Sequence, residues 1–236
     1  MNYKKLALTF GASVLALGLA STVANAQEFS TAASFGGYSD YRLRGVSLSD
    51  KEGVIQGSFD GTVKFSDSFS VFAGAWASSL DTEAGFGSLE VDFYAGAKGA
   101  IGDLSYKGTV LRLYYPDARG LDFDQYAFEV GYPIGPFSGA AGVVYDDYDP
   151  GDSTYLWASL GYTFPDTPLS VKALIGHEDG AYGFDDKINY GVGVSYAFEK
   201  LSLNAEYIDT NKTIINPLSG KDLGDGTVVV SITTAF

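Results

Sequence analysis

The chain has 236 residues, of which 29 are acidic and 15 are Lys or Arg, so its formal net charge is −14. A chain this acidic is not expected to bind nucleic acid. The absence of cysteine and the presence of one histidine, His177, exclude disulfides, thiolate sites and the common histidine-based metal centres. The 30 glycines, 17 tyrosines and 16 phenylalanines favour many short strands over helices.

Residues 1–26 are predicted to be a cleaved secretory signal peptide. Two lysines precede an uncharged apolar run over about residues 6–20, and an Ala-x-Ala cleavage site ends at Ala26. The apolar run is shorter than the roughly 20 residues that a spanning helix needs, which disfavours the alternative of a retained anchor. The mature chain, 27–236, would start at Gln27 and be exported to the periplasm, the medium or the outer membrane. Its net charge would be −16, because two lysines and no acids are lost.

The mature chain alternates between apolar and polar residues with period two. In "KINYGVGVSYAF", residues 187–198, every second residue from Ile188 to Phe198 is apolar or aromatic, and those between are mostly Lys, Asn, Gly or Ser. This period is typical of strands with one apolar face and one polar face. The template predicts about twelve strands: 29–46, 53–65, 69–79, 88–101, 104–115, 123–133, 137–146, 154–164, 169–178, 187–198, 201–209 and 225–236. The fifth is expected to change phase near Val110–Arg112 through a bulge.

Short and long connections alternate between these strands. Turns such as Gly102-Asp103 and Glu199-Lys200 are short, whereas the connections on the other side are longer and acidic. This pattern predicts an all-β fold, a transmembrane up-and-down antiparallel barrel with short periplasmic turns and longer external loops. An even strand count places both termini on the periplasmic side. A secreted soluble β-sandwich is the rival fold, because it would also alternate.

Aromatic residues near the strand ends favour the barrel over the sandwich. They form two expected bands, as at the two interfaces of a membrane barrel. The band on the short-turn side comprises Phe65, Phe69, Tyr132, Phe137, Phe164, Phe198 and Phe236. The band near the long loops comprises Tyr114, Tyr115, Tyr126, Tyr145, Tyr155 and Tyr207.

Two segments carry a family resemblance. "SDYRLRGVSLSD", residues 39–50, matches a Ser-Asp-Tyr-Arg-x-Arg-Gly block, and residues 76–94 match a Trp-Ala-Ser block followed by an acidic strand. In these segments the chain resembles the TorF-type porin family of proteobacteria. The resemblance weakens after about residue 150. It implies an outer-membrane β-barrel with a pore role, and the terminal Phe236 is similar to the C-terminal aromatic that such barrels present to the assembly machinery.

Arg42 and Arg44 are two apart, and strand spacing would place both on one face. A lipid-facing Arg costs about 2–4 kcal/mol at the bilayer midplane, so both are expected to face the lumen. The same alternation predicts further lumenal charges of both signs. The full set of lumen or filter candidates is Asp40, Arg42, Arg44, Asp60, Lys64, Glu90, Asp92, Lys98, Glu129, Lys172 and Glu206.

The predicted function is a passive channel for small polar solutes or ions, with fixed charges as its filter. Twelve strands lie between a filled eight-stranded barrel and a wide sixteen-stranded pore, so the path should be narrow. The expected surroundings are outer-membrane lipids and lipopolysaccharide. No cofactor is implied. The main alternative is a closed structural barrel, in which the arginines hold carboxylates such as Glu90 and Asp92 in place.

Two further functions remain open at this point. A hydrolase would use His177 as its base, but no serine is placed beside that residue by the sequence, so no enzyme is expected. A soluble secreted binding protein would require the sandwich fold. The segment "DDYDPGDS" has closely spaced carboxylates but lacks the final Glu of a calcium-binding loop, so no metal site is predicted.

Overall fold

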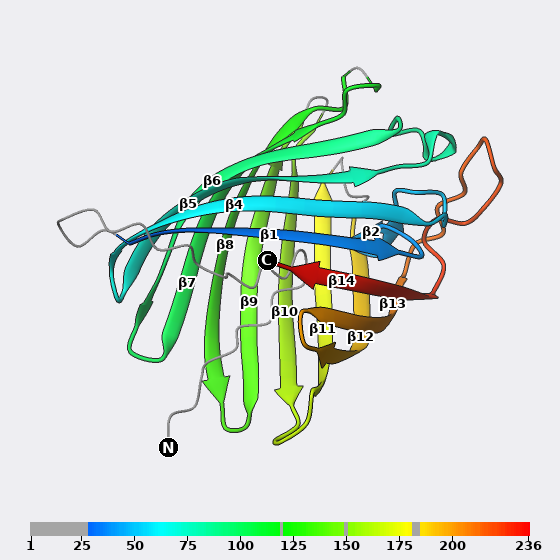
Figure 1. Ribbon diagram of the computed structural model, residues 1–236. Coiled ribbons are helices and arrows are strands. Elements are labelled where there is room, and N and C mark those ends of the chain that lie inside the picture. Colours follow the sequence, from blue (N-terminus) through cyan, green and yellow to red (C-terminus); the bar gives the residue numbers. More distant parts are fainter. Residues whose placement is uncertain (1–27, 119, 149–150, 181–184) are drawn as a thin grey trace.

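The computed structural model describes residues 28–118, 120–148, 151–180 and 185–236. The predicted signal peptide and its cleavage site at Ala26 and Gln27 lie outside this range. Within the described residues, twelve long strands close into one antiparallel barrel, as Figure 1 shows. The predicted up-and-down barrel of about twelve strands is therefore confirmed.

The barrel strands follow one another in chain order around the wall, and β1 closes on β14. They are β1 (Glu28–Tyr38), β4 (Val54–Ser66), β5 (Phe69–Ser79), β6 (Leu89–Ile101), β7 (Leu104–Tyr114), β8 (Phe123–Ile134), β9 (Phe137–Asp147), β10 (Ser153–Thr163), β11 (Leu169–Gly180), β12 (Lys187–Phe198), β13 (Leu201–Thr210) and β14 (Thr227–Ala235). A separate hairpin is formed by β2 (Arg42–Leu43) and β3 (Val46–Ser47), and one 3-10 turn, η1, spans Thr82–Ala84.

Two details of the predicted strands are wrong. The first strand was expected to run to residue 46, but β1 ends at Tyr38, and the chain turns back at Arg44 and Gly45, where φ is 49° and 92°. The bulge expected near Val110–Arg112 is also absent, since β7 keeps one register with β6 and β8 throughout. The register shift lies instead in β4, between Lys64 and Ser66.

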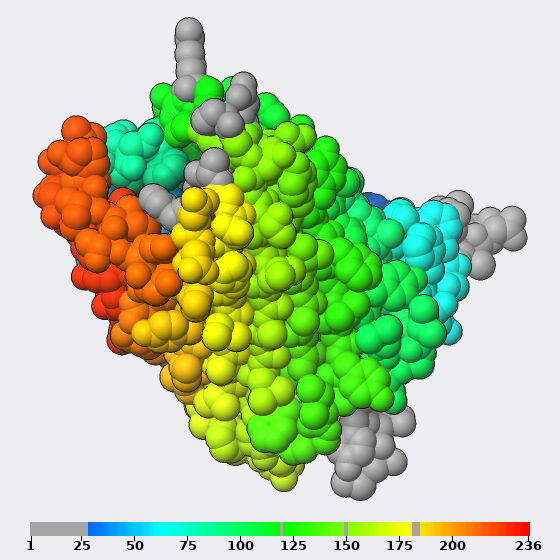
Figure 2. Space-filling model, turned by 180° about the vertical axis from the view of Figure 1, so that it is seen from behind, coloured from blue at the N-terminus to red at the C-terminus, as the bar shows by residue number. Residues whose placement is uncertain are grey.

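The outer surface of the wall is apolar. Outward residues such as Phe59, Phe93 and Val192 are 60%, 55% and 59% exposed, although each lies in the middle of its strand. Figure 2 shows this face as a continuous wall over the strands from β7 to β13. A soluble protein does not expose so large an apolar surface, whereas lipid tails would cover it. No helix among the described residues is long and apolar enough to cross a membrane.

The aromatic bands differ partly from the prediction. Phe65, Tyr132 and Phe198 point outward near the short turns, and Tyr126 and Tyr207 do so near the long loops. Tyr115, which directly follows β7, and Tyr155 of β10 were assigned to the outer band but point inward. Along each segment the odd-numbered residues face the lumen. Tyr115 is 2% exposed and Tyr155 is 6% exposed, so the prediction was wrong for both.

The seam between β1 and β14 is the shortest in the barrel. Only Ser34–Tyr38 of β1 pairs with Ser231–Ala235 of β14, whereas β1 pairs with β4 over all eleven of its residues. The terminal Phe236 extends the seam by one pair of backbone hydrogen bonds. Its N–H donates to the carbonyl of Ala33 at 2.9 Å, and the N–H of Ala33 donates back at 3.1 Å.

Candidate functional site: the lumen and its mouth

Residues 39–53, which join β1 to β4, cross the mouth of the barrel; we call them the mouth loop. Their contacts reach three strands in different parts of the wall: β5, β9 and β12. Tyr41 packs against Trp76 of β5 with ring centroids 5.4 Å apart, and Arg44 pairs with Asp146 of β9. A Cβ atom on Gly45 would lie only 2.9 Å from Asn189 of β12. Because one segment contacts β5, β9 and β12, it lies across the outer end of the lumen.

An apolar cluster anchors the mouth loop to the inner wall. Leu48 is 3% exposed and packs with residues of β7 and β8 and of the loop between them. The buried members are Leu48, Leu80, Leu113, Tyr115 and Phe123. Burying a Leu side chain typically contributes about 1.5–3 kcal/mol, so this cluster gives the mouth a small protein core of its own.

Arg44 stands at the tip of the hairpin and is held by two carboxylates. Its guanidinium forms a fork with Asp146, with Nη1–Oδ2 and Nη2–Oδ1 distances of 2.6 and 3.1 Å, and Nη1 also donates to Glu178 of β11. Gln125 donates to the same Asp146 at 2.6 Å. Lys187 completes the group, since its Nζ lies 2.6 Å from Glu178. Asp146, Glu178 and Lys187 are buried, so this is an ion-pair network rather than a solvated charged surface.

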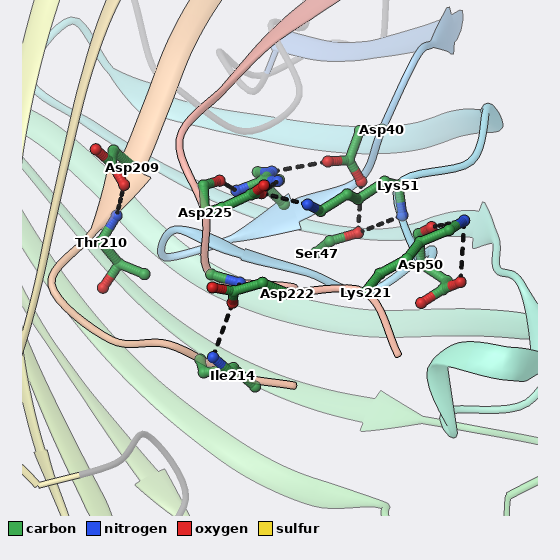
Figure 3. A network of polar contacts seen from close by, with 12 residues as sticks. Asp40, Ser47, Asp50, Lys51, Asp209, Thr210, Ile214, Lys221, Asp222 and Asp225 are labelled. Carbon is green, nitrogen blue, oxygen red and sulfur yellow. Dashed lines mark hydrogen bonds and ion pairs between the residues drawn. The ribbon is translucent and has the colours of Figure 1, made fainter. Parts of the chain in front are cut away.

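Arg42 makes a second set of contacts, within the mouth loop and to the connection that precedes β14. Its Nε donates to Asp40 at 2.7 Å, and its Nη1 donates to the carbonyl of Asp225 at 2.7 Å. Asp40 also accepts from Ser47 at 2.6 Å and from Ser49 at 3.0 Å. Figure 3 shows Asp40, Ser47 and Asp225 gathered around this point. Arg42 therefore fixes the shape of the hairpin and ties it to the chain just before β14.

The long connection between β13 and β14, residues 211–226, packs over the mouth loop. Asp50 is 1% exposed and accepts hydrogen bonds from Asn216 and Ser219, each at 2.7 Å. Lys221 lies 3.1 Å from Asp50 (Figure 3). It also lies 2.8 Å from Glu52. The backbone N–H of Ser47 in β3 also donates to the carbonyl of Leu223 at 2.9 Å. The two loops thus form one polar layer at the mouth.

The pKa values of three groups in this layer are shifted in the directions that favour ion pairing. Burial alone would lower the pKa of Arg44, but the carboxylates of Asp146 and Glu178 outweigh burial and raise it. Burial would raise the pKa of Asp50, but hydrogen bonds from Ser219 and Asn216 and the charge of Lys221 lower it overall. The pKa of Lys221 is raised by its bonds to Glu52 and Asp50. All three groups are therefore charged at neutral pH.

The inner half of the lumen carries charges that are more exposed and less closely paired. Lys98 of β6 and Lys107 of β7 are direct cross-strand neighbours, and each Nζ lies 5.5 Å from the ring centroid of Phe72. Lys107 approaches Glu129 of β8 at 3.7 Å, with side chains 37% and 28% exposed. Two like charges directly opposite each other are unfavourable for a sheet, so stability does not explain this lysine pair.

The remaining predicted candidates line the wall at different depths. Asp60 of β4 accepts a hydrogen bond from Tyr94 at 2.6 Å, and Lys172 of β11 interacts electrostatically with Glu206 and Glu129. Lys64 lies at the periplasmic-type end, where its 42% exposed side chain pairs with a turn residue, Asp67. These candidates do not form a single ring.

Glu90 and Asp92 lie on β6 directly beneath the mouth loop. Glu90 is 0% exposed and Asp92 is 9% exposed. Tyr41 donates to Glu90 at 3.3 Å, but neither carboxylate contacts Arg42 or Arg44. The hypothesis that the arginines hold Glu90 and Asp92 is therefore wrong. Because the chain leaves the wall at residue 39, the arginines reach the mouth instead of facing the β6 wall.

The charged residues absent from the predicted set include Lys107, Asp146, Glu178 and Lys187. Glu178 and Asp146 have the parity of other inward residues on β11 and β9, so alternation could have identified them. Lys107 was missed because the supposed phase change in β7 obscured its direction. The partnership of Arg44 with Asp146 spans 102 residues, and no local pattern indicates it.

His177 lies at the outer end of β11. Its Nε2 is 2.9 Å from Asp186, and the two side chains are 45% and 83% exposed. In the described part of the chain no serine or threonine hydroxyl is recorded in contact with this imidazole. The described residues also contain no group of three or more His, Cys, Asp or Glu side chains able to hold a metal ion.

A closed twelve-stranded wall with an apolar outside, a charged inside and a folded-in loop defines an outer-membrane-type β-barrel. The chain belongs to the family described as "Bacterial protein of unknown function (Gcw_chp)", whose model matches residues 22–236. That description carries neither the TorF-type name expected from the sequence nor a function. A search of curated proteins gives no match.

Solved structures share the fold at low identity. The KdgM porin aligns with a TM-score of 0.55 and 10% identity, over 87% of this chain and 99% of that one. The same porin in complex with disordered oligogalacturonate aligns with a TM-score of 0.53 and 8% identity, over 87% and 99%. The COG4313 outer membrane channel from Pseudomonas putida F1 gives 0.50 and 10%, over 92% and 97%. At these identities the likeness shows the barrel fold.

Proposed function

We propose that this protein is an outer-membrane channel that lets small polar solutes or ions diffuse through a narrow charged lumen. The single observation that carries the proposal is the inner lumen. There Lys98, Lys107 and Glu129 project from a closed wall and retain solvent exposure instead of forming tight buried pairs. Fixed charges that keep access to water can act on a passing solute. The alignments with the KdgM porin and the COG4313 channel are in keeping with this role.

The mouth loop would set the width of the path. Twelve strands alone leave a lumen intermediate between a filled barrel and a wide pore. The mouth loop and its apolar cluster narrow that lumen further at the outer end. We therefore expect low conductance, with the inner charges deciding ion preference. The terminal Phe236 would be presented to the assembly machinery, and lipids with lipopolysaccharide would cover the outer wall.

A closed barrel without transport is the second candidate. The observation that favours it is the same mouth layer, because Arg44, Asp50 and Lys221 tie two loops across the opening. Both candidates are barrels of the same fold in the outer membrane, and they differ only in whether solutes pass through the lumen. A hydrolase using His177 has less support, since among the described residues the contact recorded for this imidazole is with Asp186.

Purified full-length mature protein in a planar bilayer distinguishes the two. A channel gives discrete conductance steps, and the reversal potential in a salt gradient gives its ion preference. A folded barrel that shows a heat-modifiable gel shift but no steps would overturn the channel proposal and favour the closed barrel. The soluble fraction of cells expressing the chain should contain none of the mature protein, and its presence there would contradict the membrane assignment.

A further inference from the structure

We propose that Lys98 and Lys107 form a binding site for a small monovalent carboxylate in the inner half of the lumen. Lys98 of β6 and Lys107 of β7 are direct partners across the ladder, so both side chains leave the wall side by side on its lumenal face. The inference rests on the proposed channel function, which it deepens by naming a class of solute. Binding itself requires no transport, so the site and the channel can be tested apart.

Phe72 of β5 holds the two ammonium groups near one point. Its ring is 8% exposed and lies over Gly96 of β6, where a Cβ atom would be 2.7 Å from the ring. The Nζ atoms of Lys98 and Lys107 are each 5.5 Å from the centroid of this ring. A cation at such a distance is attracted by an aromatic face. One buried ring therefore keeps both cations together, although like charges directly opposite each other repel.

Carboxylates of the wall match the charge of this pair only in part. Among the described residues, no carboxylate lies within ion-pair distance of Lys98, and the charge of Lys107 acts on it more strongly than that of Asp60. Lys107 has one partner, Glu129, at 3.7 Å, and both of these side chains are partly exposed. Two cations and one loosely held carboxylate leave one positive charge over, which a monovalent anion would neutralise.

The ammonium groups are accessible from the lumen. Lys98 is exposed, and the side chain of Lys107 is 37% exposed. The neighbouring lumenal positions toward the short turns are small: Ser70 on β5, Ser105 on β7 and Gly131 on β8. Small residues at these positions leave the two lysines open to water from the inner end, so a dissolved anion can reach them.

A carboxylate suits these donors better than a polyanion does. An ammonium group has three N–H donors and no acceptor, so each lysine can donate to one of the two carboxylate oxygens. A divalent phosphate would bring a second negative charge toward Glu129 and Asp60. Binding should be weak because both lysines are solvated, and weak binding lets a solute leave a channel as well as enter it. The expected class is therefore the anion of a small organic acid.

Chloride NMR measures anion binding to the purified, folded protein in neutral detergent and does not depend on transport. The chloride resonance broadens when the ion exchanges with sites on the protein, and acetate should reverse that broadening in a saturable way. Most of the acetate-sensitive broadening should be lost in K98Q/K107Q. It should be kept in K200Q/K212Q, which removes the same charge from a short turn and an outer loop.

Equal acetate-sensitive broadening in wild type and K98Q/K107Q, or an equal loss in the control, would overturn the proposal. Divalent phosphate that displaces chloride as effectively as acetate would overturn the assignment to a monovalent carboxylate. If K98Q/K107Q lacks the gel mobility of a folded barrel, K98Q alone replaces it. Acetate-sensitive broadening without conductance steps in planar bilayers would contradict the channel and leave the anion site standing, and steps without that broadening would do the reverse.

Discussion

In the outer half of the lumen the side chains of Arg44, Asp146 and Glu178 are at most 6% exposed, whereas Lys107 and Glu129 in the inner half are 37% and 28% exposed. The outer groups bond at 2.6–3.1 Å in the fork to Asp146, while the inner pair is 3.7 Å apart. The same residue types therefore serve two purposes. Buried charges with several bonds hold a loop in the mouth, and exposed charges with loose bonds remain available to a solute.

The largest expected effect comes from the outer half. Arg44→Met removes the cation between Asp146 and Glu178 and leaves both carboxylates buried, although Lys187 still contacts Glu178. Breaking a buried pair in this way costs about 3–5 kcal/mol. We expect a lower urea midpoint for the mouth, measured by hydrogen exchange of residues 39–53 and by gel mobility. The control is Arg112→Met, since Arg112 is 48% exposed and pairs on the outside of the wall. Equal shifts in the two variants would contradict the comparison.

The next largest effect on the stability of the mouth loop is expected when the pH is lowered. The pKa of Asp50 is lowered in the folded protein, so its stabilisation is complete above the unfolded pKa of about 3.9 and is lost as pH falls through the lower, folded pKa. As the pH falls below about 4, the protection factors of amide hydrogens in the mouth loop, corrected for the intrinsic exchange rate at each pH, should decrease. Asp50→Asn should exchange faster already at pH 7 and respond less to acid. An identical pH response in wild type and Asp50→Asn would show that other groups control the loop.

The smallest effect on stability is expected in the inner half. Lys107→Gln should change the free energy of unfolding by less than about 1 kcal/mol, because exposed pairs contribute little. It should nevertheless shift the reversal potential toward cations, since one positive charge leaves the lumen. Lys64→Gln, at the rim, is the matched control and should shift the potential less. An effect of Lys107→Gln on stability without any change of selectivity would reverse the distinction between the two halves.

The barrel wall was predictable because its strands obey a local rule. Lipid outside and polar groups inside impose period two on each strand, so the span 187–198 and the turn at Gly102 could be read directly from neighbouring residues. The mouth loop was not predictable in the same way. "SDYRLRGV" continues the alternation past Tyr38, and the departure from the wall depends on the turn at Arg44 and Gly45.

The lumenal partners show the same limit. Whether a side chain faces the lumen follows from its odd or even position along the strand. The structure places Asp60, Glu90 and Glu129 on the inner wall. Which charged side chains pair with one another does not follow from this alternation, because the pairs depend on where the mouth loop crosses the lumen. Arg44 and Glu178 are 134 residues apart, and Asp50 and Asn216 are 166 apart. Such pairs are selected by three-dimensional packing of the loop, which no periodic pattern encodes.

Replacing the mouth loop tests most directly whether it constricts the lumen. Tyr38 of β1 and Val54 of β4 are direct partners across the ladder, so an Asn-Gly turn can join the strands in place of residues 39–53. In planar bilayers, wild type should give small conductance steps and the shortened protein steps several-fold larger, with both proteins showing the gel mobility of folded barrels. Equal conductance in the two folded proteins would contradict the account.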